Sequence, residues 1–238
     1  MPAQTTNTTH KRLSILGDDE IEALYGRPRF TDDERCEYFS LSATEKALLE
    51  QFHSTPSRIY CLLQLGYFKA RSRFFVFDLH EVMEDIRYIQ EQYFPGFQGT
   101  SFAITKVTRL RQQRFILDLY HYRLCGAQER QQLETKAPQA ARVDSKPLSV
   151  FRALMHYLAT QRIVSPAYSV MQDTVGKALT DEQRRLTALL RRSLGPSETR
   201  ALQALLEDAQ GLYAITRLKR EPRDFSAREM AREIGRGQ

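Results

Sequence analysis

Large apolar residues recur three or four positions apart along most of the chain, which is the spacing of one face of an α-helix. One such stripe lies between Ile86 and Phe94, and another between Leu186 and Leu194. The second stripe faces away from a group of arginines, namely Arg184, Arg185, Arg191 and Arg192. The pattern predicts an all-α, multi-helical protein.

Helix-start signals support this fold class. A Ser or Thr stands three residues before a Glu at Thr31–Glu34, Ser42–Glu45 and Ser226–Glu229, which is the spacing of a capping box. The acidic clusters at these places are therefore interpreted as helix caps and not as catalytic carboxylates.

The weakest organisation lies between Ala127 and Lys146, which is rich in Gln, Ala and basic residues and contains Pro138. We place a domain boundary there and expect two helix-turn-helix-like helical domains, both DNA-binding. The predicted ranges are a disordered tail at 1–11, a first domain at 12–133, a linker at 134–146 and a second domain at 147–238.

Charge and composition narrow the class of partner. The net charge is +6 and the isoelectric point near 9.3, which favours a polyanion. Three cysteines without a CxxC spacing indicate reduced thiols. No apolar run approaches the roughly 20 residues of a membrane span, and the polar N-terminus lacks a signal peptide, so we expect a cytoplasmic protein.

The first candidate site is the stretch from Gln51 to Phe77, which contains no acidic residue. Cations alternate there with aromatic side chains, as suits a surface that lies against phosphates. We expect a helix from Pro56 to Leu65, a left-handed stop at Gly66 and a basic turn after it. The proposed DNA contacts are Arg58, Tyr67, Lys69, Arg71 and Arg73.

The second candidate is a predicted helix from Thr105 to Arg123. Its first half is basic and its second half is apolar nearly all round, so we expect a buried second half and a first half that projects cations toward DNA. A solvated helix face is the alternative interpretation. The proposed contacts are Lys106, Arg109, Arg111 and Arg114.

The third candidate lies between Val150 and Leu179, where two predicted helices flank a short turn and could form a helix-turn-helix. Gln172 could read adenine there, although any helical hairpin would give a similar pattern. The proposed contacts are Arg162, Tyr168, Ser169, Gln172 and Lys177, together with Arg184, Arg185, Arg191 and Arg192 on the following helix.

Signals for catalysis and for metal binding are poor. His121 and Cys125 stand one helical turn apart without a second pair, which fits a packed histidine and a buried thiol better than zinc. The chain has no phosphate-cradling glycine loop. We expect neither an active site nor a metal nor a cofactor.

Several motifs, in order, resemble the N-terminal region of the Tn-three family of bacterial transposases. They run from Leu13–Leu16 and Leu24–Thr31 through Tyr38–Leu41, Gln64–Phe77, Gln161–Ile163, Pro166–Ser169 and Leu218–Arg220 to Arg223–Ser226. The resemblance implies helical DNA-binding domains that hold the terminal inverted repeats of a transposon. It places the catalytic acidic triad of the family in a far larger C-terminal portion that nothing here matches.

The leading hypothesis is therefore sequence-specific binding of double-stranded DNA at transposon ends, in replicative transposition and without catalysis. The partners it names are this DNA and the transposase itself, as a dimer. The alternative is a helical interaction module that regulates full-length transposase. An enzyme in its own right has little support.

Overall fold

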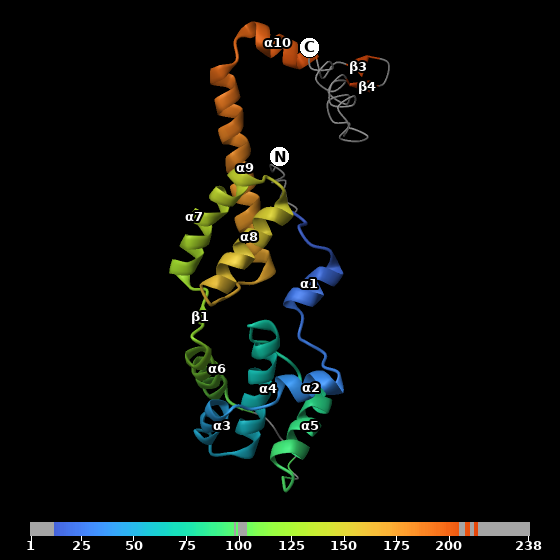
Figure 1. Ribbon diagram of the computed structural model, residues 1–238, viewed down its shortest axis with the longest axis vertical. Helices are drawn as coiled ribbons and strands as arrows, with labels where there is room; N and C mark the ends of the chain where they lie inside the picture. Colours follow the sequence, from blue (N-terminus) through green and yellow to red (C-terminus); the bar gives the residue numbers. More distant parts are fainter. Residues whose placement is uncertain (1–11, 98, 100–103, 205–207, 210–211, 214–238) are drawn as a thin grey trace, which may run out of the picture. The chain divides into compact units, whose positions relative to one another are not determined.

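The computed structural model describes residues 12–97, 99, 104–204, 208–209 and 212–213 (Figure 1). Ten α-helices and one short 3-10 helix make up nearly all regular structure in these ranges, which confirms the all-α prediction. The chain divides into two compact units, Met1–Glu182 and Gln183–Gln238, which are described separately below. No helix in the described part is long and apolar enough to cross a membrane.

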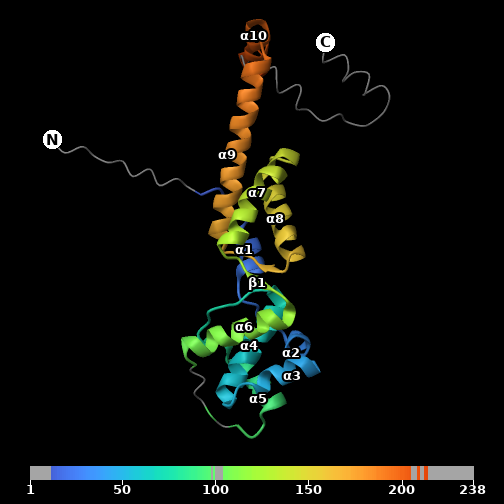
Figure 2. The same cartoon turned by 90° about the vertical axis from the view of Figure 1, so that its left-hand side faces the viewer.

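The first core of the larger unit surrounds one buried helix, α4 (Thr55–Arg71). Figures 1 and 2 show the shorter helices packed around it. These are α2 (Asp32–Tyr38), α3 (Ala43–Glu50), α5 (Met83–Tyr93), which follows the 3-10 helix η1 (Leu79–Val82), and α6 (Lys106–Tyr120). Because α4 is covered on all sides, its sequence is apolar nearly all round and lacks a single amphipathic stripe.

The predicted stop at Gly66 is wrong, because α4 continues through it to Arg71. A Cβ atom at Gly66 would lie 2.3 Å from Cε1 of Phe39, so the glycine allows this ring to pack directly on the helix backbone. The helix ends instead at Ser72, whose φ of 49° gives it the left-handed cap conformation.

Two of the predicted capping boxes are confirmed. The Thr31 and Ser42 hydroxyls accept from the backbone N–H groups of Glu34 and Glu45, whose carboxylates accept from the two cap residues. The third, Ser226–Glu229, lies outside the described residues, as do the 1–11 tail and the motifs at Leu218–Arg220 and Arg223–Ser226.

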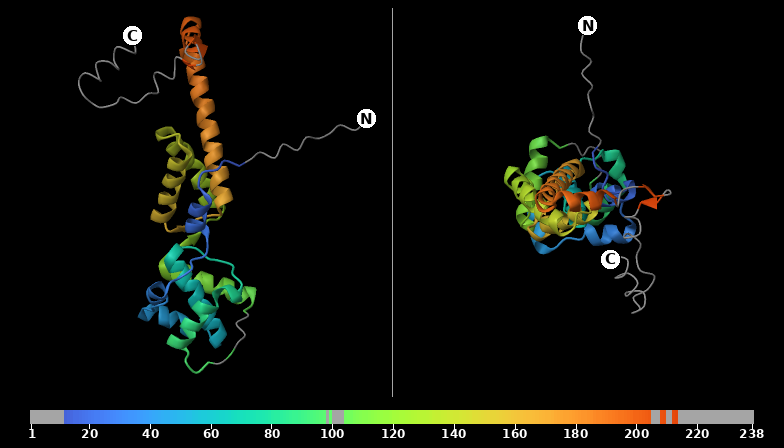
Figure 3. Two further views of the ribbon diagram at one scale, coloured as in Figure 1. Left: turned by 90° about the vertical axis from the view of Figure 1, so that its right-hand side faces the viewer. Right: turned by 90° about the horizontal axis from the view of Figure 1, so that it is seen from above.

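The second core combines α1 (Asp18–Tyr25) with α7 (Ala127–Val143), α8 (Pro147–Thr160) and the first part of α9 (Tyr168–Ser193). Figure 3 shows the helical arrangement from two further sides. The N-terminal segment from Leu13 to Tyr25 thus packs in one core with residues more than a hundred positions later.

The linker expected at 134–146 is mostly helical, because α7 continues to Val143 with Pro138 inside it. Its buried side consists of Leu133, Ala137 and Ala141, spaced four residues apart against α8. Two of these three side chains are alanines. They let α7 and α8 approach closely, but they give a weak apolar signal in the sequence.

A short parallel pair joins the ends of the two cores. Strand β1 (Arg123–Leu124) pairs with β2 (Ile163–Val164), with Arg123 opposite Ile163. Gly126 follows β1 and precedes α7 as its N-cap.

The smaller unit contains the part of α9 from Gln183 onward and α10 (Pro196–Ala204). It also holds a two-residue antiparallel pair of β3 (Asp208–Ala209) with β4 (Leu212–Tyr213).

A buried carboxylate ties three helices of the first core together. Glu45 of α3 accepts hydrogen bonds from the Tyr120 hydroxyl of α6 and from Ser42, and its Oε1 lies 3.0 Å from Nζ of Lys69 on α4. Burial opposes the ionisation of Glu45, but these hydrogen bonds outweigh it and hold the pKa of Glu45 below its usual value.

We expect Glu45→Gln to lower the free energy of unfolding at neutral pH and to lose this effect in acid. Because the folded-state pKa of Glu45 is depressed, its carboxylate stabilises the fold above the ordinary glutamate value of 4.5, and that contribution disappears as the pH falls through the folded-state pKa. Urea titrations of both proteins over a pH series measure the difference. Glu37→Gln, at an exposed position of α2, is the control, and a gap between wild type and Glu45→Gln that stays constant into acid would contradict the assignment.

Candidate nucleic-acid interface

Helix α6 carries three exposed cations of the first core, Lys106, Arg111 and Arg114. Thr105 begins it by accepting a hydrogen bond at Oγ1 from the backbone N–H of Thr108, at 3.1 Å. On the inner side, Nε2 of Gln112 donates to the backbone carbonyl of Ser57 at 2.8 Å and to its hydroxyl at 3.0 Å. Because Gln112, Ile116 and Leu117 are buried against the core, the rotation of α6 about its axis is fixed.

The opposite side of this helix consists of Lys106, Val107, Leu110, Arg111 and Arg114, which we call the α6 outer face. All five side chains are exposed, and within the described part of the chain none of the three cations forms an ion pair. Arg109, also predicted as a DNA contact, is half-buried toward one edge of the helix. The acidic residue of α6, Asp118, lies one turn beyond Arg114.

Aromatic rings hold one cation of this face in place. The Arg111 guanidinium lies 5.4 Å from the centre of the Phe115 ring and 6.0 Å from that of Phe52. Arg58 of α4 donates from Nε to the Phe52 carbonyl at 2.6 Å, so Phe52 contacts cations from two helices. The structure thereby brings Arg58 close to the α6 outer face.

Two predicted DNA contacts in the stretch from Gln51 to Phe77 are unsuited to phosphate binding. Tyr67 has no exposed surface, and its hydroxyl donates to Oδ2 of Asp85 at 2.6 Å. Burial, with Asp85 beside it, raises the pKa of Tyr67. Lys69 is 20% exposed and donates to the Ser40 carbonyl at 2.5 Å, besides its ion pair with Glu45. Assigning Tyr67 as a DNA contact is therefore wrong. The ammonium group of Lys69 is engaged by Glu45 and Ser40 within the first core.

Arg73 connects the two cores. Its Nη2 donates to the carbonyls of Ser165 and Pro166, both at 3.1 Å, and to the Ser165 hydroxyl. Its guanidinium also lies 4.2 Å from the centre of the Tyr25 ring. Burial lowers the pKa of Arg73 and raises that of Tyr25 to about 12. Arg73 is thus a structural brace, whereas Arg71 on the same segment remains exposed.

The start of α9 holds the N-terminal segment. The Tyr168 hydroxyl accepts from the backbone N–H groups of Ile15 and Leu16, at 3.2 and 2.9 Å, and Nε2 of Gln172 donates to the Leu13 carbonyl at 2.8 Å. A recognition helix needs these side chains free for base edges. The interpretation of Tyr168 and Gln172 as base contacts is therefore corrected: their polar groups bind the protein's own backbone. Ser169 beside them is half-buried.

The remaining cations of the third candidate are exposed but partly engaged. Arg162 has a left-handed φ of 51° and donates from Nη1 to the Tyr120 carbonyl at 3.2 Å. Lys177 lies 3.8 Å from Oε2 of Glu134 on α7, with both side chains more than half exposed. Such an exposed pair contributes little to stability, so Lys177 can exchange this partner for another anion at little cost.

The smaller unit carries the other predicted contacts. Arg184, Arg185, Arg191 and Arg192 are all exposed on α9. The predicted leucine stripe of this helix is also exposed, by 40% at Leu186, 52% at Leu189 and 51% at Leu190. This part of α9 is therefore amphipathic, and its leucine side is not covered by other described residues.

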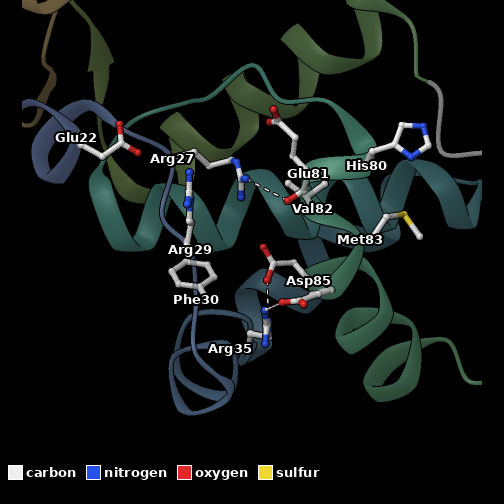
Figure 4. Close-up of a pocket in the computed structure, with 11 residues that line it drawn as sticks. Glu22, Arg27, Arg29, Phe30, Arg35, His80, Glu81, Val82, Met83 and Asp85 are labelled. Atoms are coloured by element: carbon white, nitrogen blue, oxygen red, sulfur yellow. Dashed lines mark hydrogen bonds and ion pairs between the residues drawn. The ribbon is translucent and has the colours of Figure 1, made fainter. Parts of the chain in front are cut away.

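A pocket of about 550 Å³ lies beside η1 and is lined by side chains of both charges (Figure 4). Arg35 is paired there with Asp32, Glu84 and Asp85 at 2.7–2.8 Å, and Arg27 donates to the Glu81 carbonyl at 3.1 Å. These bonds engage the guanidinium groups of Arg35 and Arg27 within the protein. Among the described residues, no group of three or more His, Cys, Asp or Glu side chains is placed to hold a metal ion.

Sequence reasoning located the cations of α6 but overlooked Val107 and Leu110 between them. The signal that could have found them is spacing. Val107 stands three and four residues before Leu110 and Arg111, and Arg114 stands four and three residues after them, so all four share one side of a helix.

We expect Gln172→Ala to lower the free energy of unfolding by about 1 kcal/mol, because it removes the hydrogen bond to the Leu13 carbonyl. Urea denaturation measures this loss. Gln131→Ala, at an exposed position of α7, is the matched control and should change stability far less. Equal stability of the two variants would show that Gln172 does not hold the N-terminal segment.

Comparison with known proteins identifies a family and a relative. A family model described as "Domain of unknown function (DUF4158)" matches residues 15–178. The chain is also 24% identical over 229 residues to the transposase for transposon Tn3926 of Escherichia coli. That match covers 94% of this chain and 23% of the transposase, so the chain spans about a quarter of the length of this relative. The chain therefore belongs to the DUF4158 family and is related to the Tn-three family transposases.

Proposed function

We propose that this protein binds the terminal inverted repeats of a transposable element as double-stranded DNA, and that it does so without catalysing strand transfer. The observation that carries the proposal is the α6 outer face, where Lys106, Arg111 and Arg114 are exposed and form no ion pair in the described residues. The relationship to a transposase supports DNA as the polyanion that this face meets.

The physical basis is the release of counterions. Each phosphate that a lysine or arginine neutralises frees condensed cations from the duplex, which favours binding and makes it depend on salt. An arginine already paired with a carboxylate, such as Arg35, must first lose that partner and gains little. The α6 cations have no such partner to lose among the described residues, so they can bind phosphate without that cost.

Other cations are added to the proposed DNA contacts. Arg58 lies next to Arg111 through Phe52, and Arg71 and Arg162 are accessible in the larger unit. We assign these to phosphate contacts, together with the half-buried Arg109 and with Lys177. As a separate set in the smaller unit, we also assign Arg184, Arg185, Arg191 and Arg192 to phosphate contacts. Tyr67, Lys69, Arg73, Tyr168 and Gln172 are left out, because the fold uses them.

A second candidate function is an interaction module that pairs with a full-length transposase. The exposed stripe of Leu186, Leu189 and Leu190 favours it, because exposed apolar rows of this kind often mark protein-binding surfaces. Co-purification of the two proteins in the absence of DNA, lost when these leucines become serines, would support the module over the DNA-binding function.

Removing the α6 cations should weaken the dependence of DNA binding on salt. With about six phosphates neutralised, the slope of log affinity against log salt is near −5, and Lys106→Ala with Arg111→Ala and Arg114→Ala should flatten it by roughly 2.5 to 3. Filter-binding titrations on an inverted-repeat duplex and a scrambled duplex measure both the slope and the specificity.

The matched control replaces three exposed cations elsewhere in the larger unit, Lys46, Arg87 and Arg152, which gives the same change in net charge. Its slope should stay close to that of the wild type. An unchanged slope in the α6 variant would exclude this face, and equally weak binding to both duplexes would defeat the sequence-specific proposal.

A further inference from the structure

Two large apolar side chains lie exposed among the cations of the α6 outer face. Val107 is 76% exposed and Leu110 is 52% exposed, while Lys106, Arg111 and Arg114 flank them. Water contact at such side chains is unfavourable, so a partner that covers them is favoured. A face that combines apolar and cationic groups in this way is complementary to a partner with both anionic and apolar groups.

The DNA major groove offers both kinds of group. Phosphates line its edges, and the 5-methyl group of every thymine projects into it as an apolar contact. An α-helix with its side chains is about 10–12 Å across, which fits the roughly 12 Å width of this groove. An acidic protein surface would also attract the cations. Its charged groups alone, however, would not provide an apolar contact for Val107 and Leu110.

We propose that α6 enters the major groove and that Val107 and Leu110 read thymine 5-methyl groups there. This inference rests on the proposed DNA-binding function and assigns base readout to residues other than Tyr168 and Gln172. Lys106, Arg111 and Arg114 hold the flanking phosphates or guanine edges.

The placement of the two side chains suits this role. They are three residues apart, so their Cβ atoms lie about 5–6 Å from each other on one side of the helix, and they contact methyl groups on neighbouring base pairs. The hydrogen bonds of Gln112 to Ser57 fix the rotation of α6, so the pair always faces outward. The aromatic contacts of Arg111 hold one flanking cation beside them.

Replacing thymine by deoxyuracil removes the methyl group and leaves the phosphates and hydrogen-bonding edges unchanged. The probe is a duplex enriched from a random-sequence pool by binding to the full chain, synthesised once with thymine and once with deoxyuracil. Wild type should bind the deoxyuracil duplex roughly fourfold more weakly for each contacted methyl group. The double variant Val107→Ala, Leu110→Ala should bind both duplexes with nearly equal affinity.

Val143→Ala is the matched control, because Val143 is 90% exposed on α7, away from this face. It should discriminate between the two duplexes as the wild type does. Circular dichroism of all three proteins should be the same, since the replaced side chains are exposed.

The possible results separate the two proposals. If wild type binds DNA in a salt-dependent manner but treats thymine and deoxyuracil alike, methyl readout is overturned and DNA binding stands. If the double variant still discriminates, other residues contact the methyl groups and the assignment to Val107 and Leu110 is overturned. Failure of the wild type to bind any duplex overturns both proposals, and transposase capture that depends on Val107 and Leu110 would then identify the face as a protein-binding surface.

Discussion

The burial of α4 is the constraint from which the first core follows. Eleven of its seventeen residues are buried, so helices must cover it from every direction, and α2, α3, α5 and α6 do so. Gly66 allows the Phe39 ring to lie against the helix backbone, and Tyr67 satisfies its buried hydroxyl at Asp85. The hydrogen bonds of Gln112 to Ser57 then fix α6 on this scaffold. The direction in which the α6 outer face points is thus decided inside the core.

The second constraint is that the fold itself engages some of the cations. Lys69 pairs with Glu45, Arg35 with three carboxylates, and Arg73 binds the Ser165 and Pro166 carbonyls of the other core. In each case a buried or half-buried charge has gained several partners, as a desolvated charge requires. Net charge alone therefore overstates the binding surface. The cations left for a polyanion are the exposed ones that the fold does not use.

Contacts distant in sequence hold the N-terminal segment in the second core. Tyr25 and Phe151 both pack against the ring of Tyr168, whose hydroxyl binds the backbone of the N-terminal segment. Arg73 adds a link from the end of α4. Residues that a linear scan assigns to a recognition helix are therefore part of the contact between the N-terminal segment and α9. This arrangement explains why the helix-turn-helix pattern at 150–179 was misleading about which side chains are accessible.

The sequence by itself determined the helical class, the capping boxes at Thr31 and Ser42 and the basic first half of α6, because these depend on local spacing and local hydrogen bonds. Only the tertiary structure decided that α4 continues through Gly66, that α7 continues through the expected linker, and that Tyr67 and Gln172 face protein. The physical reason is that the exposure of a side chain and its hydrogen-bond partners depend on contacts with residues that are distant in the chain. A sequence does not distinguish an arginine that binds other parts of the core from an arginine that is exposed, because the difference lies in their neighbours in space.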